Sequence, residues 1–556
     1  MRRWQPSFAP GMVCSLLAGL CLHAAQQPKV EPPAQRTTVE YTSESFPYFS
    51  FDELKTLSLN QPIPPELDAK LDKVLRGVIV SRAGTASPQL PDRGNIGKVL
   101  RVADWNIERG EHFDQVDQTL RSSPELAAAI KTRAASDDAI ANRLTSDDAL
   151  LRASDILVLN EADLGVTRSG YRDVAKELAD HLGMSYVFGT EFLEVDPLKL
   201  GTETIKKEEV GGDEELEKEL NSDLKPDPAR YKGLHGTTLL TRLPIDTVEM
   251  VQLPVCHDWF TDEIKQSALI EKGKRVGSDV IFLEKIDREI RRGGRMALIV
   301  RLKLPESPTG YITVVATHLE NKCKPECRLT QMKMLLDQVK TISDPVVLAG
   351  DLNTTGADGA NLSVQYIVVK KVKDYRFWVR QSLLFATPVP SLHMLKYFKN
   401  YTDPTARDIK FLVENREAGL FNSTQKMQFH DGDQFDFRGE SDRTVNGRRK
   451  RLADSNERAS KGFDYTFALP RDFKGIVGRE KLDWIFVKPV DACSEPDKGH
   501  LFVPYYGQTM VELDNVYPQQ SADHSPLIAD LRLTSDKPDE HCPSETTPST
   551  KSNKSQ

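Results

Sequence analysis

Short apolar runs that border polar residues recur along this chain. The runs are Val99–Ala103, Ile156–Leu159, Tyr311–Ala316, Pro345–Ala349 and Trp484–Val487. Short apolar runs of this kind are typical of buried β-strands. Because the ends of strands in a rigid sheet can present polar groups to a cleft, the pattern predicts one site built at several strand ends.

Two segments between the runs show the spacing of amphipathic helices. In the first, apolar residues recur every three or four positions, at Leu329, Met332, Leu335, Leu336, Val339 and Ile342. In the second they stand at Val174, Leu178 and Leu182. Gly183 follows, where a helix commonly ends. Strands that alternate with helices are typical of a parallel sheet. The C-terminal half is rich in strands with long connections and does not follow that pattern. Periodicity alone therefore does not decide whether the sheets are parallel or antiparallel.

The polar residues beside these runs are rich in carboxylates, carboxamides and histidines. They are Asn106, Glu161, His318, Asp351, Asn353, Asp483, Asp523 and His524. Hydrolysis of a phosphate ester needs an in-line nucleophile, stabilisation of charge on the phosphate oxygens and help for the leaving oxygen. Hard divalent cations prefer oxygen ligands, and histidine titrates near neutral pH. The set therefore indicates a metal-assisted site that acts on phosphate.

Three motifs follow one another in a fixed order: Gly-Asp-Leu-Asn at 350–353, Leu-Asp-Trp-Ile-Phe-Val at 482–487 and Ser-Ala-Asp-His-Ser-Pro at 521–526. With them, residues 99–533 resemble the endonuclease/exonuclease/phosphatase superfamily. That superfamily includes deoxyribonuclease-like and apurinic-site nucleases, inositol-polyphosphate phosphatases and neutral sphingomyelinases. Two features depart from the family pattern: Asn160 stands where glutamine is usual, and the interval from Asp351 to Asp483 is long. The long interval leaves the substrate open.

The resemblance implies an α+β fold. Its architecture would be a four-layered α/β/β/α sandwich, in which two packed and mainly antiparallel sheets are flanked by helices. It also implies a divalent cation, Mg²⁺ or Mn²⁺. Glu161 is the candidate for the principal ligand, Asn106 offers a carboxamide oxygen beside it, and Asp523 completes the set. A lone carboxylate at a strand end would more often be a surface group, so the prediction for Glu161 depends on the matching position of Asn106.

The catalytic groups are predicted by the same motifs. His524 would activate water, and the resemblance, not the spacing, supplies Asp483 as the carboxylate that orients it. Asp351 would orient or deprotonate the attacking water, or hold a second metal ion. Asn353, two residues on in an extended segment, would bind a phosphate oxygen from the same side. His318 would donate a hydrogen bond to the scissile phosphate.

Other polar residues have simpler interpretations. His235 and Arg295 occupy segments similar to the family's middle strands, and a structural role is favoured for both. Asp431, Asp433 and Asp436 lie close together but lack the pattern of a calcium-binding loop, which favours a polar loop.

The chain divides into a signal peptide, a linker with an N-terminal extension, one large domain and a tail. The segments are 1–25, 26–95, 96–534 and 535–556, and the domain carries insertions near 122–152, 196–230 and 366–475. Arg2 and Arg3 precede an apolar stretch and then small residues, a layout that is typical of an export signal. The apolar stretch is too short for a membrane span. We therefore expect a secreted or periplasmic protein with no stable membrane span after cleavage. The 122–152 insertion, rich in alanine, is expected to be helical.

Cysteine usage fits an exported protein. Without the signal segment, the cysteines are Cys256, Cys323, Cys327, Cys493 and Cys542. Cys323 and Cys327 flank a short turn, which favours a local disulfide between them. The odd number leaves at least one thiol free or paired between chains.

The sequence limits the class of substrate only in part. A formal net charge of −8 is unlike that of a typical nucleic-acid binder, although a local basic cleft can coexist with an acidic exterior. The basic run Arg448–Arg451 favours nucleic acid, but a solvated loop explains it equally well. We expect a monomer that hydrolyses a phosphodiester in the manner of a nuclease. The alternatives are a phosphatase or phospholipase-C-type enzyme on a small or lipid ester, such as sphingomyelin or an inositol phosphate, and a non-catalytic binding protein on the same fold.

Overall fold

The computed structural model describes residues 38–135, 137–204, 225–264, 289–354, 417–436, 465–468, 479–491 and 499–535. The predicted signal peptide, the C-terminal tail from residue 536, and most of the insertions at 196–230 and 366–475 lie outside these ranges. So do Arg448–Arg451, Cys493 and Cys542. Within the described ranges, no helix is both long and apolar enough to cross a membrane.

The larger of two sheets contains nine strands. In order across the sheet they are β1 (Val39–Tyr41), β2 (Gly77–Ser81), β5 (Ser185–Glu194), β6 (Leu234–Thr241), β4 (Ile156–Leu164), β3 (Val99–Asn106), β18 (Leu527–Arg532) and β17 (Pro504–Thr509), and β8 (Arg291–Gly293) pairs with β5. Only the pairs β1–β2 and β3–β4 are parallel. The sheet is therefore mainly antiparallel.

The smaller sheet has five strands. They run in the order β14 (Asp483–Lys488), β11 (Val346–Asp351), β10 (Tyr311–Thr317), β9 (Met296–Lys303) and β7 (Ile245–Gln252). The pair β10–β11 is parallel and the others are antiparallel. Two short ribbons complete the described strands: β12 (Phe467–Ala468) with β13 (Arg479–Glu480), and β15 (Val490–Asp491) with β16 (His500–Leu501).

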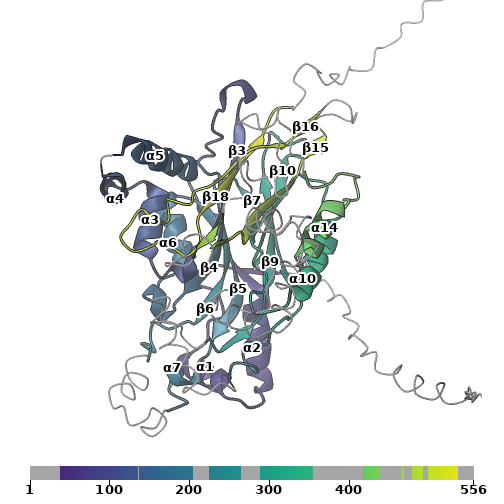
Figure 1. Ribbon diagram of the computed structural model, residues 1–556. Helices are drawn as coiled ribbons and strands as arrows, with labels where there is room; N and C mark the ends of the chain where they lie inside the picture. The colour runs from purple at the N-terminus through teal and green to yellow at the C-terminus, as the bar shows by residue number, and fades with distance from the viewer. Residues whose placement is uncertain are drawn as a thin grey trace, which may run out of the picture. The chain divides into compact units, whose positions relative to one another are not determined.

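Helices cover the outer face of each sheet (Figure 1). On the larger sheet, α3 (Phe113–Arg121) and α6 (Val174–Leu182) pack through Val116 and Leu178. On the smaller sheet, α10 (Pro325–Val339) and α14 (Ala418–Lys426) pack through Leu335 and Leu420. The predicted helix of residues 329–342 thus corresponds to most of α10, and the predicted helix after Glu161 is α6.

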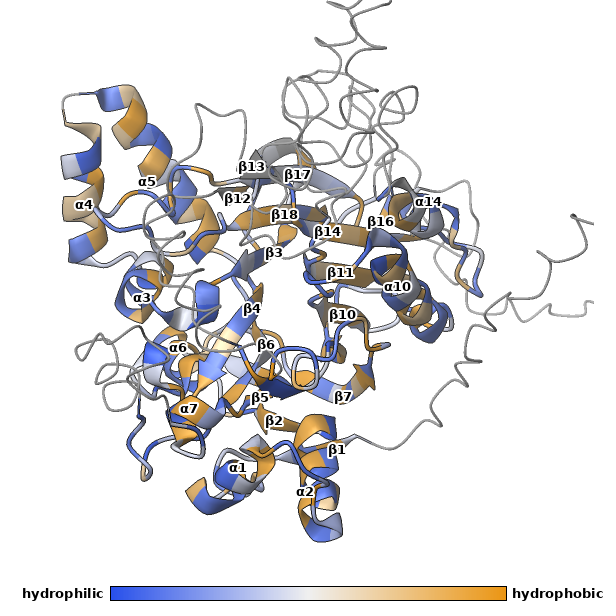
Figure 2. Cartoon of the chain, turned by 60° about the horizontal axis from the view of Figure 1, so that its bottom comes forward, coloured by the Kyte–Doolittle hydropathy of each residue, from blue (hydrophilic) through white to orange (hydrophobic). Residues whose placement is uncertain are grey.

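A third hydrophobic core lies between the two sheets. Alternate residues of each strand point to opposite faces, so Val102 and Val158 face the smaller sheet, where they meet residues such as Val314. Their neighbours Ala103 and Leu157 face the helices instead. Because both faces are covered, these strands are mainly apolar, as Figure 2 shows for β14, β11 and β10 of the smaller sheet. The predicted four-layered sandwich is confirmed.

The fold begins earlier than the predicted boundary at residue 96. Ser50 caps α1 (Phe51–Ser58) by a reciprocal arrangement with Glu53, and α2 (Pro65–Arg76) leads into β2. Strand β2 pairs with β5 in the larger sheet. Residues from 39 onward in the predicted linker and N-terminal extension thus contribute β1 and β2 to the larger sheet.

The insertion near 122–152 is helical. It forms α4 (Pro124–Ala134) and α5 (Asp138–Arg152), whose N-termini are capped by the side chains of Ser123 and Asp137. In the 196–230 insertion, the described part includes the short helix α7 (Pro197–Leu200).

The disulfide predicted between Cys323 and Cys327 is wrong. Cys327 bonds to Cys256, with 5.8 Å between the Cα atoms, and Cys323 is a buried free thiol. The Sγ of Cys323 lies instead against the main-chain oxygens of Glu320 and Lys324, at 3.4 and 3.3 Å. Cys327 stands in the first turn of α10 and faces the loop after β7, so the bond joins segments 71 residues apart.

Loss of the Cys256–Cys327 bond is expected to lower the free energy of unfolding by about 4 kcal/mol, because closing a loop of this length removes much entropy from the unfolded chain. Denaturant unfolding of Cys256→Ala, with Cys323→Ala as the control, measures the difference. A Cys323–Cys327 linked peptide in a non-reducing digest of the folded chain would contradict the pairing.

Candidate active site

The predicted site residues lie where the two sheets meet. Asn106 ends β3 in the larger sheet, and Asp351 ends β11 in the smaller one. The Nδ2 of Asn106 donates to Oδ2 of Asp351 at 3.1 Å. Asp483, which begins β14, is the direct partner of Asp351 in the antiparallel pairing of β11 with β14. Asp351 therefore contacts residues of both sheets.

Asn160 fixes the position of Asp351. Its Oδ1 accepts from the main-chain N–H of Asp351 at 2.8 Å, and its Nδ2 donates to the carbonyl of Thr317 at 3.2 Å. Gly350 makes this approach possible: its φ is +142°, and a Cβ there would lie 1.8 Å from the Thr317 oxygen. The asparagine that departs from the family pattern thus bridges the two sheets. Sequence reasoning noted this residue but gave it no role.

His524 and Asp483 form a buried pair. The Nδ1 of His524 lies 2.7 Å from Oδ2 of Asp483, so the imidazole donates to the carboxylate. The Nε2 then faces other carboxylates, at 3.8 Å from Oδ2 of Asp351 and 3.9 Å from Oδ1 of Asp523. Burial acts to lower the pKa of His524, but these carboxylates, Asp483 first among them, raise it well above its usual value.

His318 is a second histidine that approaches Asp351. Its Nδ1 accepts a hydrogen bond from Nη1 of Arg295 at 2.7 Å, so in the neutral ring the proton is on Nε2. That Nε2 lies 3.5 Å from Oδ2 of Asp351 and has no hydrogen-bond partner among the described residues. Burial and the charge of Arg295 lower the pKa of His318 well below its usual value. His318 is therefore a neutral donor.

Arg295 contacts the site through His318. Its guanidinium is buried and also binds the Glu191 carboxylate, at 2.6 Å. Glu320 lies 3.7 Å away and accepts from the indole of Trp259 at 3.0 Å. The arginine that sequence reasoning treated as structural thus sets the tautomer of a predicted substrate-binding histidine.

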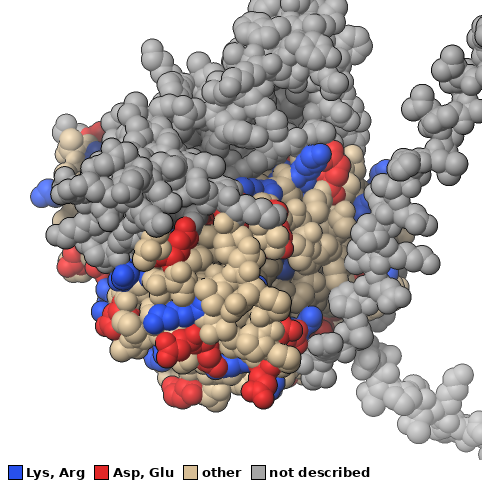
Figure 3. Space-filling view, turned by 90° about the horizontal axis from the view of Figure 1, so that it is seen from below, with Lys and Arg blue, Asp and Glu red and all other residues tan. Residues whose placement is uncertain are grey.

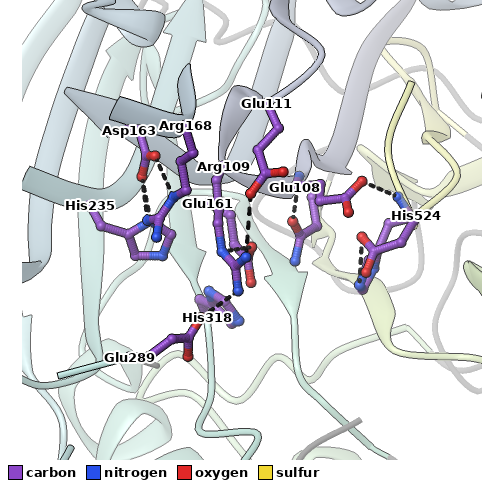
Figure 4. Close-up of polar contacts among 12 residues, drawn as sticks. Glu108, Arg109, Glu111, Glu161, Asp163, Arg168, His235, Glu289, His318 and His524 are labelled. Carbon is purple, nitrogen blue, oxygen red and sulfur yellow. Dashed lines mark hydrogen bonds and ion pairs between the residues drawn. The ribbon is translucent and has the colours of Figure 1, made fainter. Parts of the chain in front are cut away.

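His235 has a separate partner beside the site (Figure 4). Its Nδ1 lies 2.8 Å from Oδ1 of Asp163, which also binds Arg168. Burial lowers the pKa of His235 to about 3, so the ring is neutral and donates to the carboxylate.

Glu161 stands on an irregularity of β4. The register with β6 shifts between Leu159 and Ala162, and the φ of Glu161 is +57°, a left-handed conformation that side chains rarely adopt. The bulge turns the carboxylate toward Arg109, whose Nε is 3.7 Å from Oε2. Burial acts to raise the pKa of Glu161, but Arg109 and other nearby cations lower it, so the carboxylate is ionised.

The turn after β3 connects the predicted metal ligands. The N–H of Glu108 donates to Oδ1 of Asn106 at 3.1 Å, and its carboxylate accepts from the N–H of Asp523 at 3.0 Å. Burial, opposed by His524 and supported by Glu161, raises the pKa of Asp523 to about 6. The carboxylates of Asp523 and Glu161 and the carboxamide of Asn106 are oxygen donors of the kind that a hard divalent cation takes. These residues fit such an ion.

A second group of possible ligands lies on the neighbouring side. Atoms of Asp351, Asp483 and His524 lie within 4.8 Å of one another. Burial, and after it the charge of Asp483, raises the pKa of Asp351 to about 7, although His524 acts to lower it. Because Nδ1 of His524 is hydrogen-bonded to Asp483, this group is already paired internally. Oδ1 of Asp483 is buried without a hydrogen-bond partner in the described chain, so this group also offers a ligand oxygen.

Two further residues complete the site. Asn353 has φ +50°, and its N–H donates to Oδ1 of Asp351 at 2.8 Å while its Nδ2 donates to the carbonyl of Leu319 at 2.9 Å. Asp104 was missed by sequence reasoning. Both of its oxygens are buried without a hydrogen-bond partner in the described chain, and burial with the charges of Asp483 and Asp351 raises its pKa well above the usual value. The signal in the sequence was an aspartate directly after the apolar run Val99–Ala103.

Comparisons with known proteins concern the fold. No protein-family model matches the sequence, and no curated protein matches it. Among solved structures, the chain is similar to an endonuclease/exonuclease/phosphatase from Beutenbergia cavernae, at 16% identity and TM-score 0.34, over 78% of this chain and 71% of that one. The catalytic domain of human Nocturnin with bound sulfate is similar at 13% identity and TM-score 0.32, over 78% and 93%. The first of these has the family name that the sequence motifs indicate.

Proposed function

We propose that this chain is a divalent-metal-dependent phosphoesterase that hydrolyses a phosphodiester by attack of a water molecule activated by His524. The observation that carries the proposal is the arrangement around Asp351. Side-chain nitrogens of Asn106, His318 and His524 approach the same oxygen of that carboxylate, at 3.1, 3.5 and 3.8 Å. This arrangement supports the proposal, because a candidate base, His524, and a candidate donor, His318, both lie beside one carboxylate.

His524 would take the proton from water through Nε2. The hydrogen bond from Nδ1 to Asp483 fixes the orientation of the ring and stabilises the imidazolium that forms. Asp351, whose oxygen faces Nε2, would orient the attacking water. Because the carboxylates raise the pKa of His524 when no cation is present, its activity as a base requires their charge to be partly neutralised.

Neutralisation of that charge is the contribution expected of a cation. Asn106, Glu161 and Asp523 would hold Mg²⁺ or Mn²⁺, which when bound makes water more acidic and stabilises charge on phosphate oxygens. On the substrate, the Nε2–H of His318 would donate to a non-bridging oxygen without transferring its proton, and Asn353 would do the same with its amide.

A nuclease-like phosphodiesterase remains our first choice, with a small or lipid phosphoester as the alternative. Where the described residues are visible in Figure 3, Lys and Arg lie beside Asp and Glu and form no broad basic patch. We also propose export, which is supported by the Cys256–Cys327 disulfide because such bonds persist in oxidising compartments.

Hydrolysis of DNA, RNA, sphingomyelin and inositol phosphates, measured side by side with Mg²⁺ and with a chelator, tests the proposal. We expect one class to be hydrolysed with Mg²⁺ and none with the chelator. Hydrolysis that survives complete chelation would contradict metal dependence. Binding of one of these esters without hydrolysis would favour the non-catalytic alternative.

A further inference from the structure

The turn after β3 has an unusual backbone. Glu108, Arg109 and Gly110 have φ values of +45°, +63° and +67°, so three consecutive residues are left-handed. For a residue with a side chain this conformation is unfavourable, because Cβ lies too close to the following carbonyl oxygen. A Cβ on Gly110 would lie 2.8 Å from Val174, so the turn also needs its glycine. Such strain persists where the surrounding structure fixes it, and it is often found at functional sites.

The turn directs Arg109 into a ring of carboxylates (Figure 4). Its Nη2 forms a close ion pair with Glu289, its Nη1 lies 3.4 Å from Glu111, and its Nε lies 3.7 Å from Oε2 of Glu161. The Nε is buried and has no hydrogen-bond partner among the described residues. Arg109 is thus anchored by Glu289, while its contact with Glu161 is ionic and not closed by a hydrogen bond.

We propose that Arg109 is an exchangeable counter-ion of Glu161, which neutralises this carboxylate until a divalent cation takes its place. The inference rests on the proposed function, because it treats Glu161 as a metal ligand. Arg109 and a cation on Glu161 would be like charges a few ångströms apart, and at that distance they repel each other strongly even at an effective dielectric constant of about 20. Arg109 therefore weakens metal binding while no substrate is present.

A bound phosphate reverses this effect. Its negative charge attracts both the cation and the displaced guanidinium, whose planar fork matches phosphate oxygens. Metal and phosphate should then bind cooperatively, and part of this coupling should depend on Arg109. By linkage, the factor by which phosphate tightens metal binding equals the factor by which metal tightens phosphate binding.

Calorimetric titration of the full chain with Mn²⁺, without substrate, tests the inference independently of turnover. We expect Arg109→Gln to bind Mn²⁺ at least about tenfold more tightly than the wild type. Arg109→Lys keeps the charge, so its Mn²⁺ affinity should be close to that of the wild type. Inorganic phosphate should tighten Mn²⁺ binding less in Arg109→Gln than in the wild type. Unchanged or weaker Mn²⁺ binding by Arg109→Gln would overturn the inference.

Arg172→Gln is the matched control. Arg172 is a partly exposed arginine that pairs with Asp114 and Glu177, so its loss removes one positive charge without touching Glu161. Its Mn²⁺ affinity should equal that of the wild type. Arg109→Met is a second uncharged variant for use if thermal unfolding shows that Arg109→Gln does not fold. A wild-type chain that binds no Mn²⁺ would contradict the proposed function itself, whereas binding that is insensitive to Arg109 would contradict only this inference.

Discussion

Replacing Glu161 with glutamine is expected to lower turnover at limiting Mg²⁺ by more than about a hundredfold. Loss of groups that merely support a metal ligand commonly costs 10- to 100-fold in affinity or activity, and a direct ligand should cost more. The amide keeps the shape of the side chain, but it loses the charge that attracts the cation, and it leaves Arg109, 3.7 Å away, without that counter-charge. Turnover measured across a range of Mg²⁺ concentrations gives the size of the effect.

Glu111→Gln is the control for this variant. Glu111 also contacts Arg109, at 3.4 Å, but it is not a predicted ligand. Its replacement should leave the Mg²⁺ dependence close to that of the wild type. Near-native turnover by Glu161→Gln at limiting Mg²⁺ would show that Glu161 is not a metal ligand.

Replacement of His524 with alanine should reduce turnover by at least about 10², the usual size of general-base catalysis. In Asp483→Asn, the imidazolium loses the carboxylate that stabilises it most, so the pKa of His524 should fall. The base is then neutral at lower pH, and the acidic limb of the pH–rate profile should move to lower pH while the maximal rate declines. Profiles of kcat for the wild type and Asp483→Asn, recorded with saturating Mg²⁺, measure the shift.

A second histidine–aspartate pair offers the control. His500 and Asp491 lie 3.3 Å apart on the β15–β16 ribbon and are partly exposed. His500→Ala should have the wild-type rate and profile. An acidic limb that does not move in Asp483→Asn would mean that the carboxylate does not act on the base.

The strand ends were visible in the sequence because each bears a local pattern. An apolar run followed by a carboxylate, carboxamide or histidine located Asn106, Glu161, His318 and Asp351. In the structure Asn106 and Asp351 end β3 and β11, and His318 directly follows β10. Glu161 stands instead on the irregularity within β4. The type of sheet was not visible in this way. It depends on pairing between distant strands, and the family resemblance supplied it.

Other features depend on contacts that no local pattern encodes. The pair of His524 and Asp483 joins residues 41 positions apart, and the bridge from Asn160 to Asp351 spans 191. The partner of Cys327 is set by the loop that faces α10, so short spacing gave the wrong disulfide. Likewise, the role inferred for Arg109 arises from a left-handed turn that its neighbours stabilise, not from a motif.

The most direct test of the account is a double-mutant cycle of turnover with His524→Ala, Asp483→Asn and the double variant, measured on the ester that the wild type hydrolyses. A base and the carboxylate that orients it act as a unit, so removing both should cost little more than removing His524 alone. The account predicts this strongly non-additive result. Free-energy losses that add in the double variant would show that the two residues act independently and would contradict the proposed mechanism.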